Sequence, residues 1–193
     1  TSTGACVADP TETNGPYPSD GTNSVGGTIS NILAASGVVR TDIRSSFNGL
    51  SGTAAGVPMT LAIKVVNTNA SCAALAGYAV YIWHCTATGQ YSLYDLPQQN
   101  YLRGVGVTDA NGEVTFTSIY PGCYAGRFPH IHFEVFPSLA TATSQRTAVL
   151  TSQFAMPSSI SSAVYAAGGY GNSTANAAQI TTSNDNVFGD NSA

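Results

Sequence analysis

Short apolar runs separated by glycine, proline and asparagine fill the middle of the chain. Within 113–119, Val114 and Phe116 alternate with threonines, the two-residue period of a strand with one buried face. Alternation also predicts strands at 59–66 and 130–136, and short runs rich in apolar residues predict strands at 78–84 and 148–155. Residues 78–84 are nearly all apolar, which indicates burial on both faces. Asn111-Gly112 predicts a tight hairpin turn, because these two residues tolerate positive φ.

Regular structure is expected to be sparse outside these runs. Residues 158–167 follow Pro157 and end at Gly168-Gly169, which predicts one short helix. Residues 1–27 are rich in Gly, Pro, Thr and Asn and predict an irregular N-terminal arm that packs on the core. Residues 28–193 would form the remaining domain. The pattern favours a mainly β protein, a single-domain β-sandwich of mixed strands with long loops and at most one short helix.

The composition and charge of the chain argue against two kinds of partner, nucleic acids and membranes. The length of 193 residues suits one domain with a sizeable core. Charged residues make up only 8% of the chain, against about 25% in an average soluble domain. The net charge is −4 and no basic stretch is present, so nucleic-acid binding is not expected. No apolar run approaches the roughly 18 residues of a membrane span, so a membrane partner is not expected either.

The even number of cysteines indicates the compartment. Cys6, Cys72, Cys85 and Cys123 permit two disulfides, and together with the low charge they predict a secreted, extracellular protein. Three pairings are possible, and the sequence does not choose among them. Pairing Cys72 with Cys85 is awkward, because a straight strand over 78–84 would separate them by about 23 Å. No C-x-x-C motif is present, which excludes a zinc ribbon.

The segment 120–136 carries the strongest chemical signal. His130 and His132 lie two apart in a predicted strand, so both imidazoles point to the same face and can reach one metal ion. Ile131 would then point into the core. Tyr124 and Arg127 lie just upstream and add a phenol oxygen and a cation. Such a donor set suits a hard, oxidised ion such as ferric iron better than zinc.

Five ordered segments resemble the intradiol ring-cleavage dioxygenases, and most closely their small secreted branch. They are Glu12-Thr13-Asn14-Gly15-Pro16-Tyr17, Arg40-Thr41-Asp42-Ile43, the run from Tyr81 to Ser92 with its W-H-C-x-A-x-G-x-Y-S pattern, Tyr101-Leu102-Arg103-Gly104, and the run from Tyr120 to Phe133. The resemblance spans about residues 5 to 155. It implies a β-sandwich and a non-haem Fe(III) enzyme that splits catechols with O₂ to give muconic acids. Residues 28–193 would be the catalytic domain.

The resemblance also assigns roles to single residues. It implies that Tyr91, Tyr124, His130 and His132 are the iron ligands. Tyr124 would also leave the iron and act as base for a substrate proton. Arg127 matches the active-site arginine, Gln153 resembles the active-site glutamine, and Tyr17 resembles a tyrosine that lines the substrate site. Intracellular relatives dimerise through a helical region ahead of the sandwich. The arm here is rich in helix breakers, so that mode of dimerisation is not expected.

Two other interpretations compete with the enzyme. One is a secreted β-sandwich binding module with a relic metal site. The other is a zinc or copper protein that uses His130 and His132 with Cys123. Few charged residues flank the motifs, which favours uncharged catechols, catechol itself or 4-substituted and lignin-derived ones, over carboxylated ones.

Overall fold

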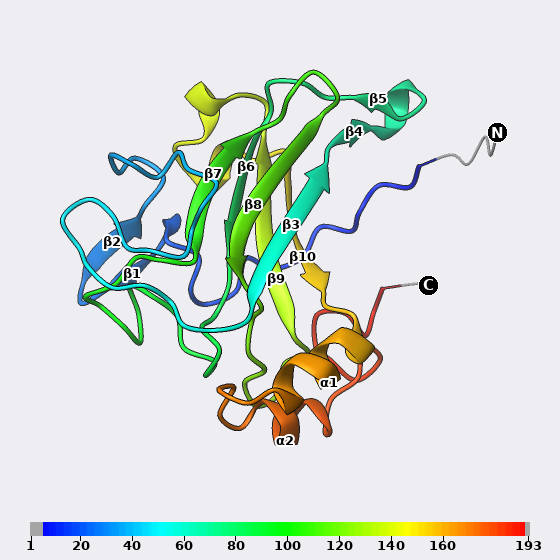
Figure 1. The fold of residues 1–193 in the computed structure, drawn as a ribbon. Coiled ribbons are helices and arrows are strands. Elements are labelled where there is room, and N and C mark those ends of the chain that lie inside the picture. Colours follow the sequence, from blue (N-terminus) through cyan, green and yellow to red (C-terminus); the bar gives the residue numbers. More distant parts are fainter. Residues whose placement is uncertain (1–5, 192–193) are drawn as a thin grey trace.

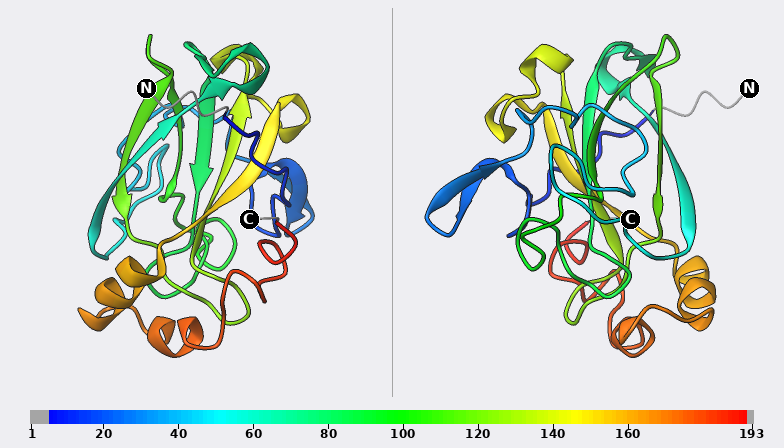
Figure 2. Two further views of the ribbon diagram at one scale, coloured as in Figure 1. Left: turned by 90° about the vertical axis from the view of Figure 1, so that its right-hand side faces the viewer. Right: turned by 60° about the vertical axis from the view of Figure 1, so that its left-hand side comes forward.

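Two sheets pack face to face in the computed structural model, which describes residues 6–191 (Figure 1). The larger sheet has the strand order β10-β9-β6-β7, and the smaller one pairs β3 with β8. The bounds are β3 (Pro58–Lys64), β6 (Ala79–Trp83), β7 (Arg103–Val107), β8 (Glu113–Ile119), β9 (His130–Phe136) and β10 (Leu150–Ala155). Figure 2 shows both layers edge-on. The predicted mainly β sandwich is confirmed. Within residues 6–191 the strand pairs are antiparallel, and parallel contacts are isolated bridges only.

Alternation along β6 and β9 divides the buried residues into two groups. Val80 and Ile82 of β6, with Ile131 and Phe133 of β9, pack against Phe116 of the smaller sheet and form the main core. This confirms that the face of β9 opposite the histidines is core. The other face carries Tyr81 and Trp83 on β6 and His130 and His132 on β9, all buried. That face is covered by loops and by the N-terminal arm.

The turn at 109–112 joins two strands that belong to different sheets. Asp109 Oδ1 accepts hydrogen bonds from the amides of Asn111 (2.8 Å) and Glu113 (2.9 Å), and Gly112 has a φ of +74°. The expected hairpin is wrong, because β7 pairs with β6 while β8 pairs with β3. The turn instead carries the chain from one layer to the other.

Strand β7 escaped the sequence pattern because two of its five residues are glycines. A Cβ on Gly104 would lie 2.5 Å from Ile43 Cγ2, and one on Gly106 would lie 2.5 Å from Val114 Cγ2. The neighbouring side chains therefore occupy the space over this strand. Glycine weakens the alternation signal of a strand, but here it permits close packing.

Residues 1–5 of the expected arm lie outside the described residues, and the rest of the arm, 6–27, is only partly irregular. The expectation is wrong for residues 20–25, because β1 (Asp20–Val25) pairs with β2 (Thr28–Asn31) across Gly26 and Gly27, both with positive φ. The other short elements are β4 (Val66–Asn67), β5 (Ala73–Ala74), and three 3₁₀ turns, η1 (Thr68–Ala70), η2 (Leu139–Thr141) and η3 (Gln145–Thr147). The expected helix is α1 (Ser158–Ala166), and a second, unexpected helix is α2 (Ser173–Ala177). Both helices lie at one end of the sandwich, opposite β4 and β5 (Figure 1).

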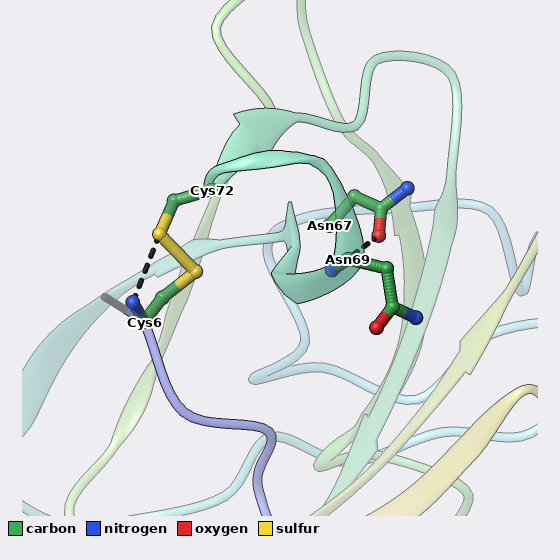
Figure 3. Close-up of a disulfide and its surroundings, with 4 residues drawn as sticks. All are labelled: Cys6, Asn67, Asn69 and Cys72. Atoms are coloured by element: carbon green, nitrogen blue, oxygen red, sulfur yellow. Dashed lines mark hydrogen bonds between the residues drawn. A yellow bond between two sulfur atoms is a disulfide. The ribbon is translucent and has the colours of Figure 1, made fainter.

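One disulfide ties the arm to the sandwich. Cys6 pairs with Cys72, with a Cα–Cα distance of 5.8 Å, beside the short η1 turn (Figure 3). Asn67 caps this turn by accepting a hydrogen bond from the amide of Asn69 at 3.0 Å. Cys85 and Cys123 are buried free thiols, so only one of the two permitted bridges forms. Within residues 6–191, no helix is long and apolar enough to cross a membrane.

Candidate metal centre

Four donor atoms lie close together beside the larger sheet. They belong to Tyr91, Tyr124, His130 and His132. Tyr91 Oη lies 3.4 Å from Tyr124 Oη and 3.3 Å from His130 Nε2. His130 Nε2 lies 3.2 Å from Tyr124 Oη and 3.1 Å from His132 Nε2. These are the separations that donors adopt when each lies about 2.1 Å from a common metal ion. The structure therefore brings all four predicted ligands together.

The two histidines are oriented by the sheet and its neighbours. They share one face of β9 because strand side chains alternate. His130 Nδ1 donates to the carbonyl of Phe128 at 2.6 Å, which leaves the Nε2 lone pair free to bind a metal. The His132 ring stacks on Trp83 of β6, with ring centroids 4.8 Å apart and planes 6° apart. Both Nε2 atoms are thus held toward the tyrosine oxygens.

The two tyrosines come from loops. Tyr91 follows β6, and its amide donates to Asp95 Oδ2 at 2.7 Å. Tyr124 lies between β8 and β9, and is only partly buried, whereas Tyr91 is 1% exposed. A Cβ on Gly89 would lie 3.0 Å from Tyr124 Cβ, and the φ of Gly89 is +83°. Glycine at this position of the G-x-Y-S motif therefore lets the two tyrosine loops approach each other.

Burial keeps all four groups neutral when no cation is present. It raises the pKa of Tyr91 well above its ordinary value and that of Tyr124 to about 12. Burial, assisted by the charge of Arg127, lowers the pKa of His130 to about 3. Burial and the neighbouring His130 lower the pKa of His132 well below its ordinary value. A metal ion bound here must displace the two phenol protons, and two phenolates with two neutral imidazoles then form a donor set suited to Fe(III).

The zinc or copper interpretation with Cys123 is wrong. Within residues 6–191, no three His, Cys, Asp or Glu side chains come close enough together to hold a metal ion. The Cys123 thiol instead donates to the carbonyl of Arg127 at 3.4 Å. Burial raises its pKa to about 11, so it stays a protonated thiol. The donor cluster depends on its two tyrosines.

Arg127 and Gln153 lie together beside the histidines. Arg127 Nη2 donates to Gln153 Oε1 at 2.6 Å. Gln153 is the partner of His132 in the β9–β10 register, and its Nε2 donates to the carbonyl of Thr13 at 2.8 Å. The charge of Arg127 lowers the pKa of both histidines, which reflects its closeness to them. The structure therefore places these two predicted residues at the edge of the donor cluster.

The N-terminal arm covers the cluster. The Tyr17 ring stacks on Tyr91, with centroids 4.7 Å apart. Gly15 has a φ of +70°, and a Cβ there would lie 3.1 Å from His132 Cε1. Only glycine combines this backbone conformation with so close an approach to the ring. Tyr17 is thus brought to the site as expected, as part of a loop that lies directly over His132.

Two further residues support the cluster, although their roles were not anticipated. Arg103 is 1% exposed and has no carboxylate partner within the described residues. Its guanidinium donates to the carbonyls of Tyr17 (2.8 Å), Pro18 (3.0 Å) and Ser92 (2.9 Å), which ties the arm to the Tyr91 loop. The L-R-G motif was its only sequence signal. Asp185, near the C-terminus, binds Arg127 at 3.0 Å and had no signal at all.

A separate cavity lies away from these residues. It has a volume of about 530 Å³ and lies on the core side of β9, between the edges of the two sheets. Its lining is mostly apolar and includes Leu61, Ile63, Phe133 and Phe154. None of the four donor residues touches it, so its size says nothing about the metal centre.

Comparisons with known proteins agree with this architecture. A family model described as Dioxygenase matches residues 35–159, more than half of the chain. No curated protein sequence matches. Among solved structures, an intradiol ring-cleavage dioxygenase from Tetranychus urticae is 23% identical, with a TM-score of 0.67, over 96% of this chain and 81% of that chain.

Two bacterial structures are also similar in fold. The dioxygenase domain of a dioxygenase carbohydrate-binding protein fusion from Streptomyces sp. SirexAA-E is 24% identical, with a TM-score of 0.51, over 90% of this chain and 83% of that chain. A 3-chlorocatechol 1,2-dioxygenase from Rhodococcus opacus 1CP is 20% identical, with a TM-score of 0.50, over 76% of this chain and 55% of that chain.

Proposed function

Because the chain belongs to the intradiol ring-cleavage dioxygenase family, we propose that it is a non-haem Fe(III) enzyme that cleaves catechols with O₂ to muconic acids. The observation that carries the proposal is the convergence of two phenol oxygens and two imidazole nitrogens: His130 Nε2 lies 3.1 to 3.3 Å from the other three donor atoms, and the two phenol oxygens lie 3.4 Å apart. Tyr91, Tyr124, His130 and His132 would hold the iron. Bound Fe(III) would make the catechol ring reactive toward O₂ without an external reductant.

Tyr124 is the better candidate of the two tyrosines for moving a proton. It is partly exposed, whereas Tyr91 is almost fully buried and stacked under Tyr17. A phenolate at Tyr124 Oη would take the proton of a catechol hydroxyl as the substrate binds, acting as a general base. Burial raises the pKa of Tyr124 to about 12, so outside the influence of a cation its oxygen holds a proton firmly.

Arg127, Gln153 and Tyr17 would act on the substrate rather than on the metal. The Arg127 guanidinium is oriented before substrate arrives, and would stabilise negative charge that develops on the ring and on the attacking oxygen. Gln153 would hold Arg127 and assist by hydrogen bonding. Tyr17 would form one wall of the substrate site and limit access of water to it.

The substrate class follows from the charges near the site. Arg103 and Arg127 are the basic residues that reach it; the first is saturated by carbonyl and hydroxyl oxygens and the second is paired with Asp185. An uncharged catechol, such as catechol itself or a 4-substituted, lignin-derived one, would suit this site. A secreted, extracellular location is supported by the Cys6–Cys72 disulfide and the 8% content of charged residues.

The proposal is tested with purified protein loaded with Fe(III), next to the same protein loaded with Zn²⁺. The iron form is expected to show the wine-red absorption of tyrosinate bound to Fe(III), and to convert catechol under air to a muconate identified by mass spectrometry. The zinc form should do neither. A ring-opened semialdehyde would mean extradiol cleavage and would overturn the mechanism. No turnover of any catechol by the coloured protein would favour the binding module instead.

A further inference from the structure

Asp185 is a fully buried carboxylate in the C-terminal segment, which lies beyond the residues 35–159 that match the family model. Its Oδ1 accepts hydrogen bonds from the amides of Val187 (2.8 Å) and Phe188 (3.1 Å). Its Oδ2 accepts from the amide of Phe128 (2.7 Å) and from Arg127 Nε (3.0 Å). Four donors therefore hold one carboxylate in place, and two of them belong to the segment that leads into His130.

An apolar cover shields the Asp185 side of this ion pair from water. Phe128, Val187 and Phe188 form a small buried cluster, and the two phenylalanine rings meet edge to face with centroids 6.4 Å apart. The Arg127 guanidinium carbon lies 5.9 Å from the centre of the Phe188 ring. The hydrogen bonds lower the pKa of Asp185 although its burial acts to raise it, so the group stays ionised. The Coulombic attraction between two charges shielded from water in this way is stronger than between two exposed charges.

The contacts of Arg127 leave one end of its guanidinium available. Nε is bound to Asp185 and Nη2 to Gln153, whereas Nη1 has no hydrogen-bond partner within residues 6–191. A planar guanidinium held at two of its three nitrogens cannot rotate, so the direction of Nη1 is determined. Asp185 also balances the charge of Arg127, so a second carboxylate that approached Nη1 would meet a neutral pair.

We propose that Asp185 is a positioning residue for Arg127: it orients the guanidinium toward a bound catechol and cancels its charge, so that the site disfavours catechols that carry a carboxylate. The proposal rests on the proposed function in what it says of catechols. The positioning itself is a property of the protein alone.

The first experiment needs neither iron nor turnover. The ¹H–¹⁵N resonance of Arg127 Nε is followed in the iron-free protein, in Asp185→Asn and in Asp190→Asn. The amide introduced by D185N would keep an oxygen for the backbone N–H groups of Val187 and Phe188, but would turn an NH₂ group toward Arg127. The Nε resonance is expected to shift and to exchange faster with water in D185N, and to stay unchanged in D190N, since Asp190 is exposed in the same segment. An unchanged resonance in D185N would overturn the proposal.

The second experiment measures kinetics on the iron-loaded forms. In D185N, kcat for catechol is expected to fall about tenfold, and the kcat/KM ratio of 3,4-dihydroxybenzoate to catechol to rise about tenfold. In an Arg127→Ala background, D185N should change neither quantity. Additive effects in this double-mutant cycle would mean a purely structural role and would overturn the proposal.

Two controls separate the possible failures. Asp185→Ser keeps an acceptor for the turn amides and removes the ion pair, so it replaces D185N if the latter does not fold. If the unsubstituted protein turns over no catechol while the Arg127 resonance still responds to D185N, the proposed function fails and the positioning of Arg127 stands.

Discussion

At the scale of single residues, the metal centre depends on side chains whose second polar atom is already engaged. His130 is the clearest example, because its Nδ1–H is bound to the carbonyl of Phe128 and its Nε2 lies within 3.3 Å of three other donors. A histidine with its proton fixed in this way presents its lone pair to a metal at no cost in reorganisation.

His130→Ala is therefore expected to lose both iron and the tyrosinate absorption band. Removing one of four protein ligands, together with its oriented lone pair, lowers metal affinity by several orders of magnitude. Iron content by elemental analysis and the visible spectrum measure the loss. His84→Gln is the matched control, since His84 is buried but hydrogen-bonded to Ser118 rather than to the cluster. Full iron occupancy in H130A would show that His130 is not a ligand.

Arg127→Ala is expected to keep the iron and its colour but to lower kcat. A charge that acts mainly on the transition state contributes about 2–4 kcal/mol to catalysis. Steady-state kinetics with catechol under air separate kcat from KM. A change in KM alone would make Arg127 a substrate anchor and contradict its assignment to the transition state.

At the scale of elements, buried polar residues join the loops and sheets around the centre. Arg103, the first residue of β7, reaches the carbonyl oxygens of the arm and both the carbonyl and hydroxyl oxygens of Ser92. His84, just after β6, links the sheets through Ser118 of β8 at 2.7 Å. The contacts of Arg103 with the arm and of His84 with Ser118 join segments that lie far apart in the chain.

Arg103→Lys is expected to loosen the arm over the metal centre and to raise KM for catechol by about tenfold. Lysine keeps the charge, but its single ammonium cannot reach the oxygens of Tyr17, Pro18 and Ser92 together. Arg40→Lys is the control. Arg40 is a partly buried arginine, but it donates to the backbone carbonyl of Arg103 and not to Tyr17, Pro18 or Ser92. Equal effects of both substitutions on KM would mean that Arg103 acts only on stability.

His84 makes the free energy of unfolding depend on pH. Burial lowers its pKa to about 4, whereas the unfolded chain titrates near 6.5. Between pH 4 and pH 6.5 the unfolded state binds more protons than the folded state. The contribution of His84 to the free energy of unfolding is therefore fully present above pH 6.5 and is lost as the pH falls toward 4. One histidine contributes about 3 kcal/mol over this interval.

His84→Gln should remove this contribution and flatten the pH dependence of stability between pH 6.5 and 4. Urea unfolding of both iron-free proteins at several pH values measures the difference, because the contributions of all other groups cancel. Parallel curves for the two proteins would show that folding does not shift the pKa of His84.

At the scale of the whole molecule, the arm, the sandwich and the C-terminal segment enclose one small site. The hairpin β1–β2 and the last described residues, which end at Asn191, lie on the outer side of the larger sheet, where the histidines point (Figure 2). The disulfide between Cys6 and Cys72 holds the start of the arm on the sandwich, 66 residues away in the chain. The site therefore depends on contacts that the two sheets alone do not provide.

Replacing Cys6 and Cys72 by serine is expected to lower the free energy of unfolding by about 4 kcal/mol, the value for cross-linking a loop of this length. Reduction of the unsubstituted protein should have the same effect, because Cys85 and Cys123 are free thiols. Titration of the denatured protein should find two thiols before reduction and four after it. No thiols before reduction would reveal a second disulfide.

The sequence by itself determined the local geometry, because strand alternation depends only on neighbouring residues. The two-residue spacing places His130 and His132 on one face of β9 and Ile131 on the other, whatever the rest of the chain does. Alternation also predicts β3 and β8, and short runs rich in apolar residues predict β6 and β10. Where glycines interrupt the alternation, as in β7, the sequence pattern does not predict the strand.

Only the tertiary structure decided which segments meet. Strand β8 pairs with β3 instead of β7, and Cys6 pairs with Cys72. These pairings, like the contacts of Arg103 and Asp185, join residues far apart in the chain. The resemblance to the family named Tyr91 as a ligand, but its approach to Tyr124 depends on how two loops close. Such contacts arise from the packing of the whole chain, which has no local periodicity, so no window of sequence can reveal them.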